Sequence, residues 1–160
     1  MTDPTTPAPT ALETNRGRFP RRHRILVVCL GNHNRSPIAA AILARLGGDR
    51  VAVHSAGLRE RHVGKGAHTN MVRAGAEYGY DIQDHTAVKV NGHMLTWADT
   101  VLAMDRAVLA ELQATADPAT AAKLSLYLHD ADVHDPWQDA YPAFLECVAT
   151  IEQGAARHLP

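Results

Sequence analysis

RILVVCLGNHNRSPIAAAILARL, residues 24–46, predicts a buried strand, a polar loop and a helix in direct succession. The run from Arg24 to Leu30 is short, apolar and rich in branched side chains, which is typical of a strand covered on both faces in a parallel sheet. Ser36 and Pro37 match the N-cap and N1 residues of a helix, and the apolar sequence after them ends at a Gly-Gly pair. The polar loop is therefore expected to join the end of a strand to the start of a helix.

Strands and helices are expected to alternate over the rest of the chain. Further strands are predicted at 50–57, 100–103 and 123–128, and further helices at 68–78, 104–114 and 141–157. This alternation favours the α/β class, as a three-layer sandwich in which helices flank a four-stranded parallel sheet. Ligands bind such sheets beyond the carboxyl ends of the strands, and Cys29 is expected at one of these ends.

The composition fits a single domain over residues 21–160, preceded by a disordered tail at residues 1–20 that is rich in Thr, Pro and Ala. A formal net charge of -1 gives no overall attraction to nucleic acid, and no stretch reaches the ~20 apolar residues that span a membrane. Cys29 and Cys147 lie far apart, so no disulfide framework is expected and the predicted location is the reducing cytoplasm. A monomer or weak dimer is expected.

The loop between Cys29 and Arg35 has the length and composition of a phosphate-binding site. Such a loop can point successive backbone N–H groups at the oxygens of a tetrahedral anion, and the helix behind it adds the positive end of its dipole. These surroundings favour the nucleophilic thiolate of Cys29, and the planar guanidinium of Arg35 can bind two oxygens. The intervening residues are Leu30, Gly31, Asn32, His33 and Asn34. A cysteine alone would more often be a small buried apolar residue, so the prediction rests on the whole combination.

This loop resembles that of the low-molecular-weight protein tyrosine phosphatases. The family sequence is usually VCxGNxCRSP, and here residues 28–37 are VCLGNHNRSP. Further matches in the same order are HSAG at 54–57, HVGKGA at 62–67, YGYDIQDH at 78–85, ADTVLAMD at 98–105 and HDPW at 134–137. The resemblance covers nearly the whole chain after the tail, and it implies the same four-stranded α/β fold.

The resemblance implies a cysteine-dependent phosphatase that needs neither a metal nor another cofactor. Cys29 would be the nucleophile and Arg35 would bind the phosphate. Ser36 would steady the thiolate, and Asp135 would act as general acid and then as general base. The polar residues implied to hold the loop in shape are Asn32, Ser55 and His85. The expected reaction is therefore two displacements at phosphorus through a phosphocysteine.

The chain departs from the family pattern at four places around the expected substrate. The departures are Asn34 for a second loop cysteine, Arg61 for a Trp or Tyr, His68-Thr69 for Asp-Pro, and Trp137-Gln138 for two aromatic residues. Without the second loop cysteine, Cys29 is expected to lack the protection of a disulfide.

The changes at the rim of the cleft predict the kind of substrate. An aryl phosphate gains from two apolar walls, and Arg61, near Arg59 and His62, replaces one of them. The predicted substrate is therefore a small anionic phosphomonoester, such as a nucleotide, sugar phosphate or biosynthetic intermediate, with Trp137 stacked on it. A phosphotyrosine protein is the alternative partner, in which case Arg61 is a solvated surface charge. The role of His33 stays open.

Other classes of function are set against this prediction. Arsenate reduction uses a related fold but needs additional cysteines to relay a disulfide, and only Cys147 remains. Asp130 and Asp132 suggest a magnesium-dependent phosphatase, but too little chain follows them to supply its other ligands. The His and Asp residues of 129–135 could hold a metal, although a solvated acidic loop is expected. A binding module without catalysis would be expected to lack one of the three catalytic residues, and all are present.

Overall fold

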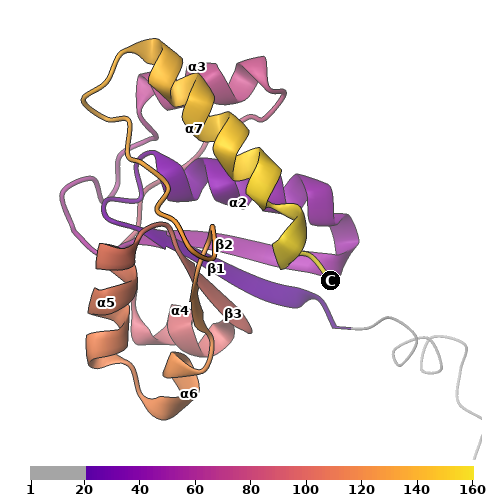
Figure 1. The fold of residues 1–160 in the computed structure, drawn as a ribbon, viewed down its shortest axis with the longest axis vertical. Coiled ribbons are helices and arrows are strands. Elements are labelled where there is room, and N and C mark those ends of the chain that lie inside the picture. Colours follow the sequence, from indigo (N-terminus) through magenta and orange to yellow (C-terminus); the bar gives the residue numbers. More distant parts are fainter. Residues whose placement is uncertain (1–20) are drawn as a thin grey trace, which may run out of the picture.

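The computed structural model describes residues 21–160, so the tail expected at residues 1–20 lies outside the described part. Four parallel strands form one sheet in the order β2-β1-β3-β4. The strands are β1 (His23–Cys29), β2 (Val51–Gly57), β3 (Thr100–Ala103) and β4 (Leu124–Leu126). Helices cover both faces of this sheet (Figure 1), which confirms the α/β three-layer sandwich.

The helices divide between the two faces of the sheet. One face carries α2 (Arg35–Gly47), with α7 (Tyr141–Gly154) packed across α2 and α3 (Thr69–Glu77). The other face carries α4 (Gly92–Trp97) and α5 (Arg106–Thr115), and the short α6 (Pro118–Ala121) leads into β4. The turns η1 (Gly48–Arg50) and η2 (Ala156–His158) follow α2 and α7. Among the helices of residues 21–160, none combines the length and the apolar character that crossing a membrane requires.

Strand β1 separates two hydrophobic cores. Ile25, Val27 and Cys29 belong to the core beneath α2 and α7, whereas Leu26 and Val28 belong to the core on the side of α4 and α5. All five side chains are at most 2% exposed. Because neighbouring side chains of a strand point to opposite faces, a strand covered on both sides needs an unbroken apolar run. Cys29 therefore ends a strand that is rigidly held on both faces.

Helix α2 begins earlier than the sequence predicted. Asn34, and not Ser36, is the N-cap residue, and its side chain makes no capping hydrogen bond. Ser36 lies in the first turn, where its hydroxyl contacts Cys29 and Asn32. The N-cap prediction was wrong because this hydroxyl is used by the loop before the helix and is not available to cap backbone N–H groups.

Two short helices and the length of β4 also differ from the prediction. The side chain of Asn91 accepts a hydrogen bond from the N–H of Met94 to cap α4, and Asp117 caps α6 in the same way. With 6 and 4 residues, these helices are too short for an apolar period to show in the sequence. Strand β4 has only 3 residues, fewer than predicted, and it pairs with β3 alone at the edge of the sheet.

Candidate active site

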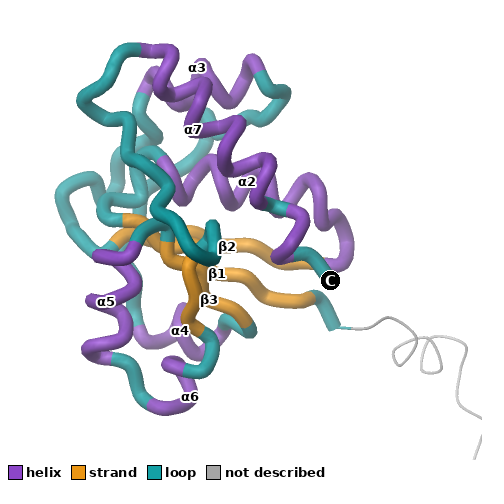
Figure 2. The backbone as a smooth tube through the Cα atoms, viewed as in Figure 1, coloured by secondary structure: helices purple, strands orange, loops and turns teal. Residues whose placement is uncertain are grey.

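A cavity of about 630 Å³ opens at the carboxyl end of β1. Its walls come from the loop after β1, the loop between β2 and α3, and the loop between β4 and α7. The lining residues are Cys29, Leu30, Gly31, His33, Asn34, Arg35, Arg59, Glu60, Arg61, His62, His68, Asp135 and Trp137. Figure 2 shows loops gathered beyond this end of the sheet. The fold thus brings the three predicted catalytic residues into one site, where parallel sheets bind ligands.

The sulfur of Cys29 is held by hydrogen bonds inside the cavity. Cys29 is 2% exposed, and its Sγ lies 3.0 Å from Ser36 Oγ and accepts from the N–H of Asn32 at 3.2 Å. Asn32 Nδ2 donates to the same Ser36 oxygen at 2.8 Å, which leaves the hydroxyl proton available for donation to the sulfur. Helix α2 starts close behind the loop and adds its positive end. These donors stabilise negative charge on the sulfur.

Asn32 organises the loop from its centre. It is fully buried and has a φ of 52°, in the left-handed region that Asn tolerates better than most residues. Its Nδ2 also donates to Ser55 Oγ at 2.9 Å, its Oδ1 accepts from the N–H of Val88 at 2.9 Å, and its carbonyl meets His85 Nε2 at 2.9 Å. Ser55 and His85 therefore both contact the loop residue that they were expected to support.

The end of β2 leaves no space between itself and the loop. Gly57 pairs with Cys29 across the sheet, and a Cβ added to Gly57 would lie 2.7 Å from the backbone of both Gly31 and Asn32. A glycine is needed here because of this close approach, at an ordinary backbone conformation. The HSAG motif thus supplies both a hydrogen-bond partner and a flat backing for the loop.

Arg35 is buried and charged, and the Nε and Nη2 edge of its guanidinium makes no hydrogen bond to residues 21–160. Nη1 donates to Asp105 Oδ2 at 2.7 Å and to the carbonyl of Val133 at 2.8 Å. Burial lowers the pKa of Arg35, but the negative charge of Cys29 and the hydrogen bond to Asp105 outweigh burial and raise it. Nε is buried without a hydrogen-bond partner in residues 21–160, and Nη2 lies 3.7 Å from Asp135 Oδ2. The Nε and Nη2 edge is the one that binds two oxygens of an anion side-on.

The role of Asp105 was missed from the sequence. Its carboxylate pairs with Arg35 and also accepts from the N–H of Val108, which caps α5. Burial raises the pKa of Asp105, but the hydrogen bonds from Val108 and Arg35 outweigh burial and hold it below its usual value. The signal was present, because Asp105 follows β3 at the same edge of the sheet as Cys29. Its partner, however, lies far away in sequence.

Asp135 lies between the phosphate-binding loop and the mouth of the cavity. Its Oδ1 accepts from Asn34 Nδ2 and from the N–H of Trp137, both at 3.3 Å. Its side chain is 30% exposed, so it faces both the buried guanidinium and solvent. Asn34, expected as a loop residue in place of a cysteine, therefore also contacts this carboxyl group.

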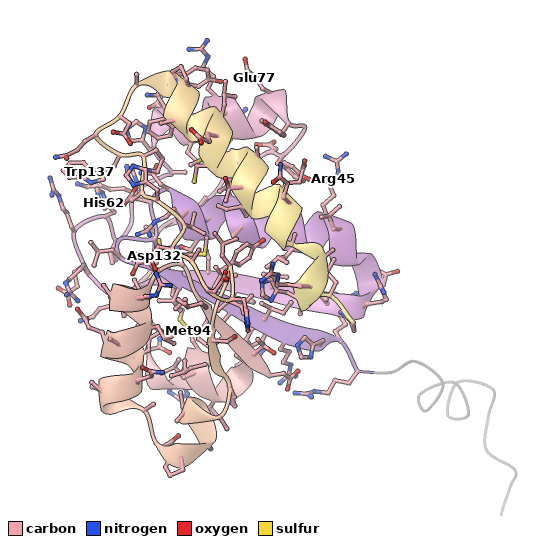
Figure 3. All side chains as sticks on the ribbon, in the orientation of Figure 1. Arg45, His62, Glu77, Met94, Asp132 and Trp137 are labelled. Carbon is pink, nitrogen blue, oxygen red and sulfur yellow. The ribbon has the colours of Figure 1, made fainter. Side chains whose placement is uncertain are left out.

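The rim of the cavity has apolar and positively charged parts. Leu30 and Trp137 are 44% and 51% exposed and line the cavity from different loops. Arg61 is exposed and lines it too, whereas Gln138, expected on the rim, is exposed but is not among the lining residues. In Figure 3, His62 and Trp137 lie at the same side of the molecule. The cavity thus keeps two apolar side chains although the expected aromatic residue is Arg61.

The alternatives with a second cysteine or a metal gain no support. Cys147 is a free cysteine buried on α7, and burial raises its pKa to about 12, so it is a poor source of thiolate. The carboxylate of Asp132 accepts hydrogen bonds from Arg106, one from its backbone N–H at 2.9 Å and one from its guanidinium. Within residues 21–160, no group of three or more His, Cys, Asp or Glu side chains is arranged to hold a metal ion.

Comparison with known proteins identifies the family. Residues 24–159 match the low molecular weight phosphotyrosine protein phosphatases. A probable low molecular weight protein-tyrosine-phosphatase, EpsP of Ralstonia nicotianae, is 35% identical over 137 residues, which are 85% of this chain and 93% of the relative. Vibrio vulnificus Wzb in complex with benzylphosphonate has a TM-score of 0.79 at 26% identity and covers 85% of this chain and 96% of its own. The YwlE arginine phosphatase from Geobacillus stearothermophilus has a TM-score of 0.78 at 26% identity and covers 85% of this chain and 90% of its own. The chain therefore belongs to the low molecular weight protein-tyrosine-phosphatase family and is a cysteine-dependent phosphatase.

Proposed function

We propose that this phosphatase hydrolyses phosphotyrosine in proteins, with Cys29 as nucleophile, Arg35 as the phosphate-binding residue and Asp135 as general acid and base. The observation that carries the proposal is the Cys29 sulfur, which lies in the cavity with Ser36 at 3.0 Å and with Arg35 and Asp135 on the same walls. A nucleophile, an anion-binding guanidinium and a carboxyl group around one cavity are the parts that phosphate transfer requires.

In the first displacement, the Cys29 thiolate attacks phosphorus in line with the tyrosine oxygen. The S–P bond forms while the P–O bond breaks, and protonated Asp135 gives its proton to the departing oxygen. Charge on the phosphate oxygens is stabilised by backbone N–H groups of the loop and by the Nε and Nη2 edge of Arg35. The products of this step are tyrosine and a phosphocysteine.

In the second displacement, a water molecule attacks the phosphocysteine. Asp135, now ionised, takes a proton from the water as the new P–O bond forms and the S–P bond breaks. The thiolate of Cys29 is restored, stabilised again by Ser36 and the N–H of Asn32. Inorganic phosphate leaves, and Asp135 is protonated for the next cycle.

The mouth of the cavity supports an aryl substrate in preference to the small anion expected from the sequence. Leu30 and Trp137 are both exposed apolar side chains that line the cavity, whereas the sequence predicted only Trp137 as an apolar contact for the substrate. Apolar and aromatic walls favour a phenyl ring, each aromatic contact contributing ~0.5–1.5 kcal/mol. The names of the relatives agree, since EpsP is named a protein-tyrosine-phosphatase and Wzb binds benzylphosphonate.

A small phosphomonoester with a second negative group is the second candidate substrate, and Arg61 favours it. Arg61 lines the cavity, and no carboxylate of residues 21–160 forms an ion pair with it. The neighbouring Arg59 is less available to a negative group of the substrate, because it already donates a hydrogen bond to Glu111 at 2.8 Å. The two candidates share one mechanism and differ only in what lies at the mouth.

The test is a comparison of kcat/KM across phosphotyrosine peptides, a phosphoarginine peptide, nucleotides and sugar phosphates, with a metal chelator present. Phosphotyrosine peptides should give the highest values. Cys29→Ser should abolish phosphate release, Cys147→Ser should retain it as the matched control, and Asp135→Asn should lower kcat ~100- to 10,000-fold. A metabolite phosphate that exceeds every phosphotyrosine peptide would contradict the proposed substrate.

A further inference from the structure

Three histidines from different parts of the sequence meet at the mouth of the cavity. His33 comes from the loop after β1, His62 from the loop between β2 and α3, and His68 from the N-cap of α3. The rings of His33 and His62 are stacked, with centroids 4.0 Å apart and planes within 2° of each other, and His68 meets His33 edge-on at 5.5 Å. The two displacements proposed above use none of them.

The surroundings of the stacked pair carry unpaired positive charge. Arg61 and Lys65 flank His62 on one loop, and no carboxylate of residues 21–160 forms an ion pair with either. Of the two carboxylates that line the cavity in this part of the chain, Glu60 is paired with Lys89 at 3.3 Å and Asp135 faces the buried guanidinium. An additional negative group at the mouth would therefore meet cations that have no partner.

Both stacked imidazoles are neutral near pH 7 in the free enzyme. Burial and the neighbouring His62 lower the pKa of His33 below 6.5, and burial and the charges of Arg61 and Lys65 lower that of His62. Asp135 raises both values, but the opposing causes outweigh it.

Two further groups affect the protonation of the pair, namely the ring of His68 and the carbonyl of Gly66. His68 lowers the pKa of both imidazoles, and His33 Nδ1 meets the carbonyl of Gly66 at 3.1 Å. Since a carbonyl can only accept, this nitrogen carries the proton, and the other nitrogen of His33 is the one that would take up another. A negative group placed close to an imidazole favours its protonated form.

We propose that the His33–His62 pair, with Arg61 and Lys65, recognises a second negative charge on the substrate and takes up one proton when that charge binds. The inference rests on the proposed function, because it assigns an acidic residue beside phosphotyrosine as the preferred context. One proton, and not two, is taken up, since two positive rings stacked at 4.0 Å would repel each other. By linkage, the preference for an acidic neighbour grows as the pH falls toward the pKa of the pair.

The test is a binding measurement that needs no catalysis. Two peptides carry 4-phosphonomethylphenylalanine, a non-hydrolysable analogue, and differ only in having Asp or Asn beside it. The ratio of the two Kd values cancels the ionisation of Cys29, Asp135 and the phosphonate, which both complexes share. From about pH 8 to about pH 5.5 the preference for Asp should rise about two- to fivefold, as expected of one partly exposed ion pair. Calorimetry in buffers of different ionisation enthalpy should show extra proton uptake with the Asp peptide.

Variants separate the titrating residue from the fixed charges. The double variant His33→Gln/His62→Phe removes both imidazoles of the pair, so its preference for Asp should stay above one and become independent of pH. Arg61→Gln should lower the preference at high pH, and because Arg61 lowers the pKa of His62, the rise in preference should begin at a higher pH than in wild type. His93→Phe, an exposed histidine on α4, is the matched control and should behave as wild type. If this double variant does not fold, His33→Gln/His62→Gln serves the same purpose.

Two outcomes would overturn the inference. One is a wild-type preference that is absent or does not change with pH, and the other is a slope that persists in a folded variant that lacks both His33 and His62. The substrate proposal is judged separately by hydrolysis, so a chain that binds the Asp peptide in this way but releases no phosphate from phosphotyrosine would contradict the proposed function and leave the inference standing.

Discussion

Arg35 keeps its position because its buried charge is balanced by Asp105 from another part of the chain. The two side chains are 2.7 Å apart and are 4% and 20% exposed. Cys29, Arg35 and Asp135 were predictable because each lies in a short, distinctive motif. Asp105 and the contact of Asn34 with Asp135 were not, because each depends on a partner that only folding brings near.

Removing the charge of Asp105 is expected to weaken both stability and activity. Asp105→Asn leaves the buried guanidinium without its counter-charge, so unfolding free energy should fall by about 1–3 kcal/mol in urea denaturation. The displaced Arg35 should lower kcat/KM by roughly 10- to 100-fold. Asp132→Asn is the matched control, because that carboxylate is 48% exposed and pairs with an exposed Arg106. Equal losses in the two variants would argue against a positioning role for Asp105.

At the level of elements, the site is a strand, a loop and a helix held against the end of a second strand. β1 supplies Cys29 and α2 begins at Arg35, so two of the three proposed catalytic residues lie at element boundaries. The loop between them stays in place because β2 ends against it with a glycine. The apolar pattern of the sequence predicts β1 and α2, whereas no periodic pattern predicts the contact between the loop and β2.

A side chain at the end of β2 is expected to displace the loop. In Gly57→Ala the new Cβ would lie 2.7 Å from backbone atoms, which cannot move aside as a flexible side chain can. Overpacking of this kind should cost about 1–3 kcal/mol in urea denaturation and weaken competitive inhibition by phosphate. Gly92→Ala is the control, because nothing lies within 4 Å of its added Cβ, and it should be neutral or slightly stabilising. Unchanged phosphate inhibition in Gly57→Ala would contradict this account.

Across the whole molecule, packing controls which titratable groups are charged. Burial lowers the pKa of His158, whose Nε2 lies 2.7 Å from the carbonyl of Tyr127 in the core beside α7. Burial also lowers the pKa values of His33 and His62, at the opposite end of the sheet. Asp105, in contrast, is held ionised by its hydrogen bonds.

Stability is expected to fall in two steps as the pH is lowered. Between pH 6.5 and the lower folded-state pKa values of the half-buried His33, His62 and His158, the unfolded chain binds more protons than the folded one, so stability declines. Below 3.8 the contribution of Asp105 is lost as the pH falls through its depressed folded-state pKa. Urea denaturation from neutral to acid pH measures both steps. His158→Gln should make the first step smaller, and a curve that is flat over the first step would show that these histidines are not held neutral by burial.

The sequence by itself determined the alternation of strands and helices, the buried strand that ends in Cys29, and the loop from Cys29 to Arg35 that is proposed to bind phosphate. These features are local, because an apolar period, a helix start and a loop of fixed spacing are each contained within a few turns of chain. The preferred substrate could not be predicted in the same way. The prediction of a small anion considered that Arg61 replaces an aromatic residue, but it did not consider the apolar surface that Leu30 adds at the mouth of the cavity.

Only the tertiary structure decided which distant side chains meet. It placed Asp105 on Arg35, Asn34 on Asp135, and His33 against His62. The physical reason is that the carboxyl ends of parallel strands lie at one edge of the sheet, so loops far apart in the chain are packed into a single cavity. Charge, burial and hydrogen bonding at that edge arise from those encounters, and no local pattern of residues contains them.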